Sequence, residues 1–77
     1  MDFPQYRKYK NIETYFKIIS EKEFEEISSL GNKYVKHSIV AKQYPEMLRI
    51  KDMLNCEGGT WEIIEATVYL KKEMHIQ

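Results

Sequence analysis

Three side chains in this sequence have the chemistry of nucleophiles or metal ligands, and they are Cys56, His37 and His75. A thiol attacks as the thiolate, and the C-terminal end of a helix, where Cys56 is expected, disfavours that negative charge. A metal ion needs ligands at recognisable spacings, which these three residues do not share. The sequence therefore predicts no metal site and no cofactor, and we interpret Cys56 and His37 as partly buried side chains.

A dense run of carboxylates is formed by Glu21, Glu23, Glu25 and Glu26. General acid and base catalysis requires a carboxyl group in a pocket that shifts its pKa, whereas a run this dense is typical of a solvated helix face. The pair Gly58-Gly59 follows an expected helix, while a phosphate-binding loop precedes one so that free N–H groups face the anion. No catalytic residue is therefore predicted, and we expect a protein that is not an enzyme.

One group of residues has the chemistry of a binding surface, and it lies on one side of an expected N-terminal hairpin. This basic-aromatic face comprises Tyr6, Lys8, Lys10, Tyr15 and Lys17. Exposed aromatic rings stack on bases and lysines contact phosphates, so the face predicts, as an alternative function, a module that binds single-stranded nucleic acid. Two other interpretations stay open: cation–π pairs of Lys8 with Tyr15 and Tyr6 with Lys17 that stabilise the sheet, or cover by a partner subunit.

The hairpin is expected over Gln5 to Ser20, where β-branched and aromatic residues flank a loop at Lys10 to Glu13. Strand side chains alternate between two faces, so a slip of one residue would mix polar and apolar positions. The register that keeps them apart pairs Tyr9 with Thr14, Lys8 with Tyr15, Arg7 with Phe16 and Tyr6 with Lys17. It places Tyr9, Thr14, Phe16 and Ile18 on the face that is expected to pack against a helix.

A further strand and a helix are expected after the hairpin. Residues Lys33 to Lys42 alternate as a strand does, with His37 on the apolar side. Residues Tyr44 to Glu57 are amphipathic at the helical period, with Pro45 where a first helical turn tolerates it and Gly58 able to end the helix in a left-handed conformation. We expect this helix to cover one face of the sheet.

Two segments fit both a helix and a strand. Ser20 to Leu30 begins like a helix, with a serine cap and a glutamate three residues later, and we expect a helix because a strand would point Phe24 and Ile27 to opposite faces. Residues 62–74 alternate as a strand does and also carry apolar residues at helical spacing. The β-forming residues 67–69 favour the strand.

The sequence predicts an α+β domain, a small antiparallel sheet led by the N-terminal hairpin and packed against one or two amphipathic helices. Its expected core consists of Phe16, Ile18, Val35, Ile39, Met47, Ile50, Leu54, Trp61 and Ile64. A chain of 77 residues makes one small domain over residues 1–77, and oligomerisation would add burial to so small a core. Its 12 basic and 12 acidic residues cancel, which disfavours a role in packaging nucleic acid.

The N-terminal MDFPQY lacks the regions of a signal peptide, the single cysteine excludes an internal disulfide, and no apolar run approaches the ~20 residues of a membrane span. We therefore expect a cytoplasmic protein without membrane contact. The function predicted first is non-enzymatic binding, through a protein partner or as a homodimer.

Four stretches of the chain, YRKY, YFKIISEKEFEEI, GNKY and AKQYP, resemble short uncharacterised bacterial proteins. In these proteins a Y/F-K-I-x-S/D-x-x-E-F-x-E-I block is followed by G-x-K-Y and later by a helix and a tryptophan. The resemblance covers most of the chain and rests on no catalytic motif. The group has no assigned function, so the resemblance carries over no active or binding residue and implies only that the chain is a complete small protein.

Overall fold

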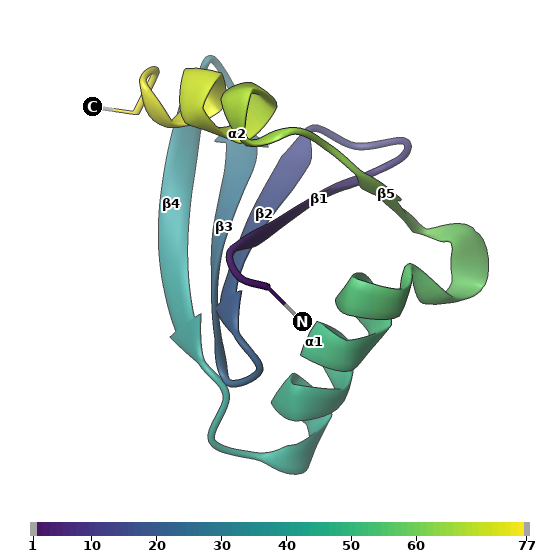
Figure 1. Ribbon diagram of the computed structural model, residues 1–77. Helices are drawn as coiled ribbons and strands as arrows, with labels where there is room; N and C mark the ends of the chain where they lie inside the picture. Colours follow the sequence, from purple (N-terminus) through teal and green to yellow (C-terminus); the bar gives the residue numbers. More distant parts are fainter. Residues whose placement is uncertain (1, 77) are drawn as a thin grey trace.

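The computed structural model describes residues 2–76, in which five strands form one antiparallel sheet and two helices pack against it (Figure 1). The strands lie across the sheet in the order β4-β3-β2-β1-β5. They are β1 (Gln5–Tyr9), β2 (Thr14–Ser20), β3 (Glu23–Leu30), β4 (Lys33–Val40) and β5 (Trp61–Ile63). Helix α1 spans Tyr44–Asn55, a 3₁₀ turn spans Glu57–Gly59, and helix α2 spans Ala66–Glu73. The predicted α+β class is confirmed.

The N-terminal hairpin has the predicted register. Strands β1 and β2 pair Lys8 with Tyr15, Arg7 with Phe16 and Tyr6 with Lys17, and residues 10–13 connect them. Because successive strand residues face opposite sides, Phe16 and its neighbour Tyr15 are buried in two different clusters.

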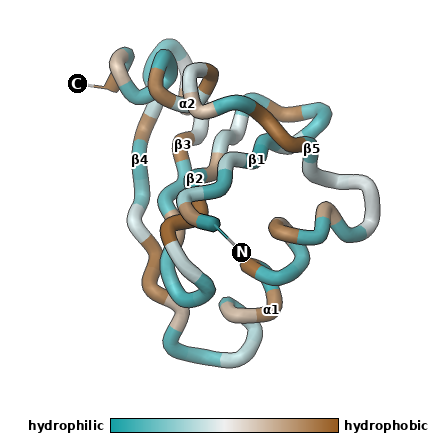
Figure 2. Tube along the Cα trace, in the orientation of Figure 1, coloured by the Kyte–Doolittle hydropathy of each residue, from teal (hydrophilic) through white to brown (hydrophobic). Residues whose placement is uncertain are grey.

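The sheet has an apolar core on each of its two faces. On one face α1 packs against the strands in a cluster of Phe16, Ile18, Phe24, Ala41, Ile50 and Met53. On the other face α2 packs Tyr69 against Tyr15 and Ile27. Figure 2 shows polar and apolar residues interspersed along the strands and around α1. A sheet covered on both sides leaves its edges as the remaining open part of the backbone.

The predicted helix over Ser20 to Leu30 is wrong, because Glu23–Leu30 forms strand β3 between β2 and β4. Phe24 and Ile27 do point to opposite faces, and both are buried because α1 covers one face and α2 the other. The Ser20 hydroxyl caps no helix. It accepts a hydrogen bond from the Lys22 N–H at 3.1 Å in the turn that leads into β3.

The strand predicted over residues 62–74 is wrong for most of its length, since β5 ends at Ile63 and residues 66–73 form α2. The buried residue of α2 is Tyr69, whereas Leu70 and Met74, two of the apolar residues at helical spacing, are exposed. The β-forming side chain of Tyr69 therefore serves as the anchor of a helix, because packing outweighs its local preference.

Helix α1 begins as predicted and ends before Glu57. Pro45 lies in its first turn, where the Glu46 carboxylate accepts a hydrogen bond from the Gln43 N–H at 3.3 Å. The left-handed residue that ends the helix is Cys56, with φ at 51°, and not Gly58 as predicted. Cys56 is partly buried, as expected.

The predicted core is confirmed in part. Phe16, Ile18 and Ile50 are buried, and Ile39, Met47, Leu54 and Trp61 are partly buried against them. Ile64 packs instead against the cluster under α2, and Val35 is half-buried. The expected core did not include the buried side chains of Arg7, Tyr15, Phe24, Ile27 and Tyr69.

Candidate functional site

The basic-aromatic face of the hairpin lies under α2 and not in open solvent. Tyr15 is only 4% exposed, and the ring of Tyr6 lies 5.5 Å from that of Tyr69. The Lys8 ammonium lies 5.9 Å from the centre of the Tyr15 ring and 3.8 Å from Glu62, so the predicted cation–π pair is confirmed. The expectation of an exposed aromatic ring is wrong for Tyr15.

The two remaining residues of this face lie apart from each other. Lys10 is exposed in the hairpin loop, and Lys17 is half-buried directly across from Glu25 of β3. The structure therefore does not join the five residues into one open surface for stacking bases.

The glutamates at residues 23–26 do not form the solvated helix face that the sequence predicted, because β3 points them alternately to the two sides of the sheet. Glu26 faces α1, where it forms an ion pair with Arg49 at 3.2 Å. The Arg49 guanidinium also lies 5.6 Å from the ring centre of Phe16 and 5.4 Å from that of Phe24. This arrangement fixes α1 on its face of the sheet.

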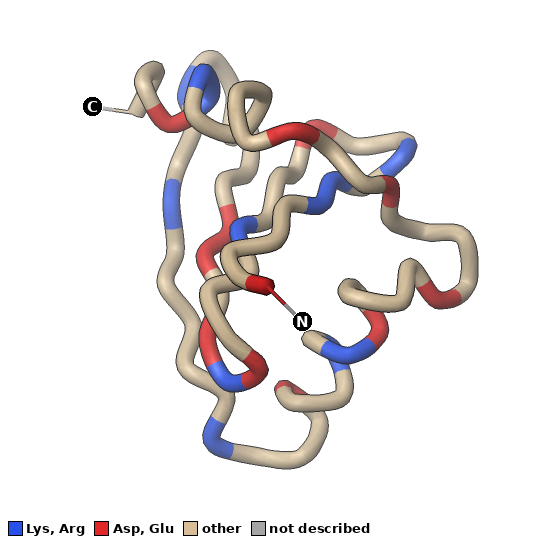
Figure 3. The backbone as a smooth tube through the Cα atoms, in the orientation of Figure 1, with Lys and Arg blue, Asp and Glu red and all other residues tan. Residues whose placement is uncertain are grey.

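Glu25 faces α2 and is the centre of a polar network. The Tyr69 hydroxyl donates a hydrogen bond to Glu25 Oε1 at 3.2 Å, and Lys36 Nζ lies 3.9 Å from the same oxygen. Lys36 also donates to Glu73 Oε2 of α2 at 3.0 Å. Figure 3 shows the charges that meet here, acidic on β3 and basic on the neighbouring β4. The ammonium of Lys36 is thus held inward, by β3 and α2, and not past the edge of the sheet.

A second chain of contacts joins α2 to the hairpin loop. Lys72 Nζ donates to the Tyr34 hydroxyl at 3.4 Å, and that hydroxyl donates to Glu13 Oε2 at 3.2 Å. The hydrogen bond with Tyr34 raises the pKa of Lys72, and burial raises the pKa of Tyr15. These contacts serve to dock α2, since each group already has a partner within the chain.

Because α2 buries the phenol of Tyr69, we expect the protein to lose stability at alkaline pH. Burial, and then the negative charge of Glu25, raise the pKa of Tyr69 above its ordinary value of 10.0. The neutral phenol is favoured by the folded state, so its contribution to the free energy of unfolding is complete below 10.0 and declines as the pH rises above the pKa of the unfolded chain. Urea titrations between about pH 8 and 11 should show this decline.

The matched control for that titration is Tyr69→Phe, which keeps the ring and removes the titrating hydroxyl. The variant should lose stability less steeply than the natural chain in the same pH range, because only the other raised groups, such as Lys36, still contribute. Identical pH slopes for the two proteins would contradict the buried position of the phenol.

Arg7 is a buried cation that sequence reasoning assigned only to a strand register. It is 4% exposed, and its guanidinium donates to the main-chain oxygens of Met53 at 2.9 Å, Leu54 at 3.2 Å and Tyr6 at 2.8 Å. Among the described residues 2–76, no carboxylate lies within ion-pair distance of it. The last carbonyls of a helix carry partial negative charge and lack helical partners, so Arg7 acts as a C-terminal cap of α1.

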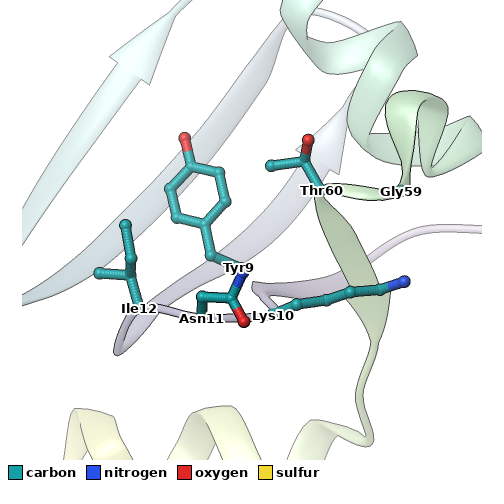
Figure 4. Close-up of a pocket in the computed structure, with 6 residues that line it drawn as sticks. All are labelled: Tyr9, Lys10, Asn11, Ile12, Gly59 and Thr60. Atoms are coloured by element: carbon teal, nitrogen blue, oxygen red, sulfur yellow. The ribbon is translucent and has the colours of Figure 1, made fainter.

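The surface of residues 2–76 includes two hollows, and neither gathers converging chemical groups. The first, of about 250 Å³, is lined by Tyr9, Lys10, Asn11, Ile12, Gly59 and Thr60 (Figure 4). In this view the Lys10 ammonium points away from the Tyr9 ring and the Thr60 hydroxyl. The second, of about 340 Å³, is lined by Asn32, Lys33, Tyr34, Val35 and His75. Within residues 2–76 no three His, Cys, Asp or Glu side chains are grouped to hold a metal ion.

A further open feature is the outer edge of β4. All residues of β4 pair with β3 on one side, and in the described part of the chain no main-chain hydrogen bond joins β4 to any other element. Along this edge His37 and Ser38 are exposed and Val40 is 52% exposed. The exposure of His37 contradicts its predicted partial burial, because α1 does not extend over this part of the strand. The β4 edge is our candidate site.

Comparison with known proteins adds no relative to this chain. No family model, no curated protein and no solved structure matches it. The resemblance to short bacterial proteins therefore stays a prediction. Across the described residues, none of the helices has the length and apolar character needed to cross a membrane. What this protein does must accordingly be argued from the β4 edge and its surroundings.

Proposed function

We propose that this protein is a non-enzymatic binding protein whose β4 edge takes up an extended segment of a protein partner as an additional strand. The observation that carries the proposal is the row of unpaired main-chain groups along Lys33–Val40, the longest open edge of the described sheet. Unpaired N–H and C=O groups on an edge strand are a template for another strand, and this mode of recognition supplies affinity through main-chain hydrogen bonds.

β4 lacks several of the features that normally protect an edge strand from pairing, although Lys33 at its start is exposed. The strand contains no proline, and its pairing with β3 runs without a bulge. The lysine in the middle of the strand, Lys36, is drawn inward to Glu73 and Glu25, so its charge does not guard the edge. By contrast, the opposite edge of the sheet is the short strand β5, which spans only Trp61–Ile63. Of the two edges, β4 is therefore the better docking strand.

The alternative function, binding of single-stranded nucleic acid, receives less support. Stacking of bases needs an accessible ring face. The rings of Tyr6 and Tyr15 are engaged by Tyr69 and by the lysines above them. We therefore favour a protein segment as the ligand of this molecule.

Selection of peptides from a random library, each about eight residues long to match the strand, tests the proposal. Enriched peptides should bind the natural chain and lose binding to an edge-blocked variant. Two candidates for that variant are His37→Pro and Ser38→Pro, because neighbouring strand residues point their N–H groups to opposite edges. One of the two loses an outward donor and stays folded, and the other breaks the ladder with β3.

The folded proline variant, identified by its circular dichroism and urea midpoint, serves as the control. Peptides that bind the natural chain at least about tenfold more tightly than this variant support the edge as the site. Peptides that bind both proteins equally, or a library without enrichment, would contradict the proposal.

A further inference from the structure

We infer that the segment taken up by β4 is β4 of a second copy of this chain, antiparallel to the first, with His37 of each copy opposite His37 of the other. The inference deepens the proposed function and depends on it, because it names the occupant of the same edge. It rests on the self-complementarity of the strand, which is visible once the pairing is worked out residue by residue.

Symmetry limits the registers that two copies can adopt. Residues directly opposite each other in an antiparallel pair point to the same face, so a two-fold axis through such a pair must bring one residue opposite itself. β4 spans Lys33–Val40, and the two registers that keep the longest overlap are centred on Lys36 or on His37. Other centres leave more of the edge unpaired.

The register centred on Lys36 is disfavoured. It pairs Lys33 of each copy with Ile39 of the other, so a charged side chain lies against an apolar one. It also pairs Val35 with His37 of the second copy, which leaves an apolar side chain against a polar one.

The register centred on His37 pairs apolar residues with apolar residues. On the side of α1, Val35 of each copy lies opposite Ile39 of the other, and both side chains are half-buried in the single chain. On the side of α2, Tyr34 lies opposite Val40, which is 52% exposed in the single chain. Symmetry makes each of these contacts twice, so the pairing covers apolar surface that one chain leaves open.

Charge does not oppose this pairing. The formal net charge of the chain is zero, so two copies approach without long-range repulsion. Lys36 lies opposite Ser38, and the two imidazoles that meet at the axis each have Glu26 of their own β3 directly across on the other side. No acidic side chain of β4 meets another, because the strand contains none.

Disulfide trapping tests both the pairing and its register. In a Cys56→Gly background, which suits the left-handed conformation at that position, His37→Cys places two thiols directly opposite each other. The Cβ atoms of such a pair lie about 4.5–5.5 Å apart, close to what a disulfide needs, whereas those of two Ser38→Cys residues would lie about 7–8 Å apart. Both positions are exposed, so the second variant is a matched control.

Under mild oxidation the His37→Cys protein should form the covalent dimer at least about tenfold faster than the Ser38→Cys protein, and in urea the two rates should be equal. Equal rates in native buffer would overturn the register. Sedimentation of the natural chain should show a dimer that the folded proline variant does not form.

A chain that stays monomeric at about millimolar concentration would overturn the second copy as occupant. Retained binding of selected peptides in that case would show that the β4 edge still acts as a docking strand. If the chain neither dimerises nor binds the selected peptides, the proposed function fails as well. The failure of the dimer and the failure of the proposed function are therefore distinguishable.

Discussion

Replacing Tyr69 by alanine should lower the free energy of unfolding by about 3–5 kcal/mol, the usual cost of removing a fully buried aromatic ring. Tyr69 is 0% exposed, and it is the buried residue through which α2 packs on the sheet. Its loss leaves Tyr15 and Ile27 without cover and removes a hydrogen bond from Glu25. Urea unfolding followed by circular dichroism measures the effect.

The matched control is Leu70→Ala, one residue further along the same helix and 44% exposed. Leucine has a helix propensity close to that of the alanine that replaces it, and the buried ring stays in place, so the cost should stay near or below about 1 kcal/mol. Equal stability of the two variants would mean that α2 is not docked through Tyr69. The cluster around Tyr69 would then not be a second apolar core of the sheet.

Replacing Arg7 by methionine should lower the free energy of unfolding by about 2–4 kcal/mol, although methionine fills a similar volume. The reason is the loss of charge-assisted hydrogen bonds to the carbonyls of Met53 and Leu54, which are then left at the negative end of α1 with fewer donors. Urea unfolding followed by circular dichroism measures this loss of stability. The substitution introduces neither proline nor glycine and so leaves the freedom of the backbone unchanged. The change in the free energy of unfolding therefore reports the loss of the guanidinium.

Arg7→Lys and Lys10→Met are the comparisons for that result. Lysine carries a single ammonium and cannot reproduce the fork that reaches two carbonyls, so it should recover only part of the loss. Lys10 lies exposed in the loop that follows the same strand, and its replacement should change stability by less than about 0.5 kcal/mol. A fully stable Arg7→Met protein would show that the cap is unimportant.

The hairpin could be predicted from the sequence because residues close together in the chain decide its structure. The alternation around Arg7 and Phe16 admits one register, and the structure has that register. Helix α1 was likewise evident from its period and from Pro45. In both elements a single stretch of chain carries the pattern that decides its structure.

The errors arose where a distant element decides the structure. In a strand Phe24 and Ile27 point to opposite faces, which a sheet covered on one face alone disfavours, but α2 covers the second face from the other end of the chain. Ser20 occurs in a pattern typical of a helix cap and in fact accepts a hydrogen bond in a turn. A serine followed by glutamate suits either role, so local chemistry alone cannot choose.

The candidate site was missed for the same physical reason. Whether a strand lies at an edge depends on the order of all strands in the sheet, and β4 is recognisable as an edge only once β5 is found beside β1. The residue types of the hairpin indicate the basic-aromatic face, but they carry no sign that α2, from the other end of the chain, covers it. The inward position of Lys36, which leaves the edge open, also depends on a contact with Glu73 far along the chain.

Amide hydrogen exchange can be resolved by residue in a solution dilute enough to keep the chain monomeric, with and without a selected edge-dependent peptide. Strand addition at β4 should slow exchange at alternate amides of residues 33–40, those that face outward, because every second residue directs its N–H to that side. The amides of Tyr6 to Lys17 should keep their rates. Protection confined to the hairpin, or no alternating protection along β4, would contradict the account.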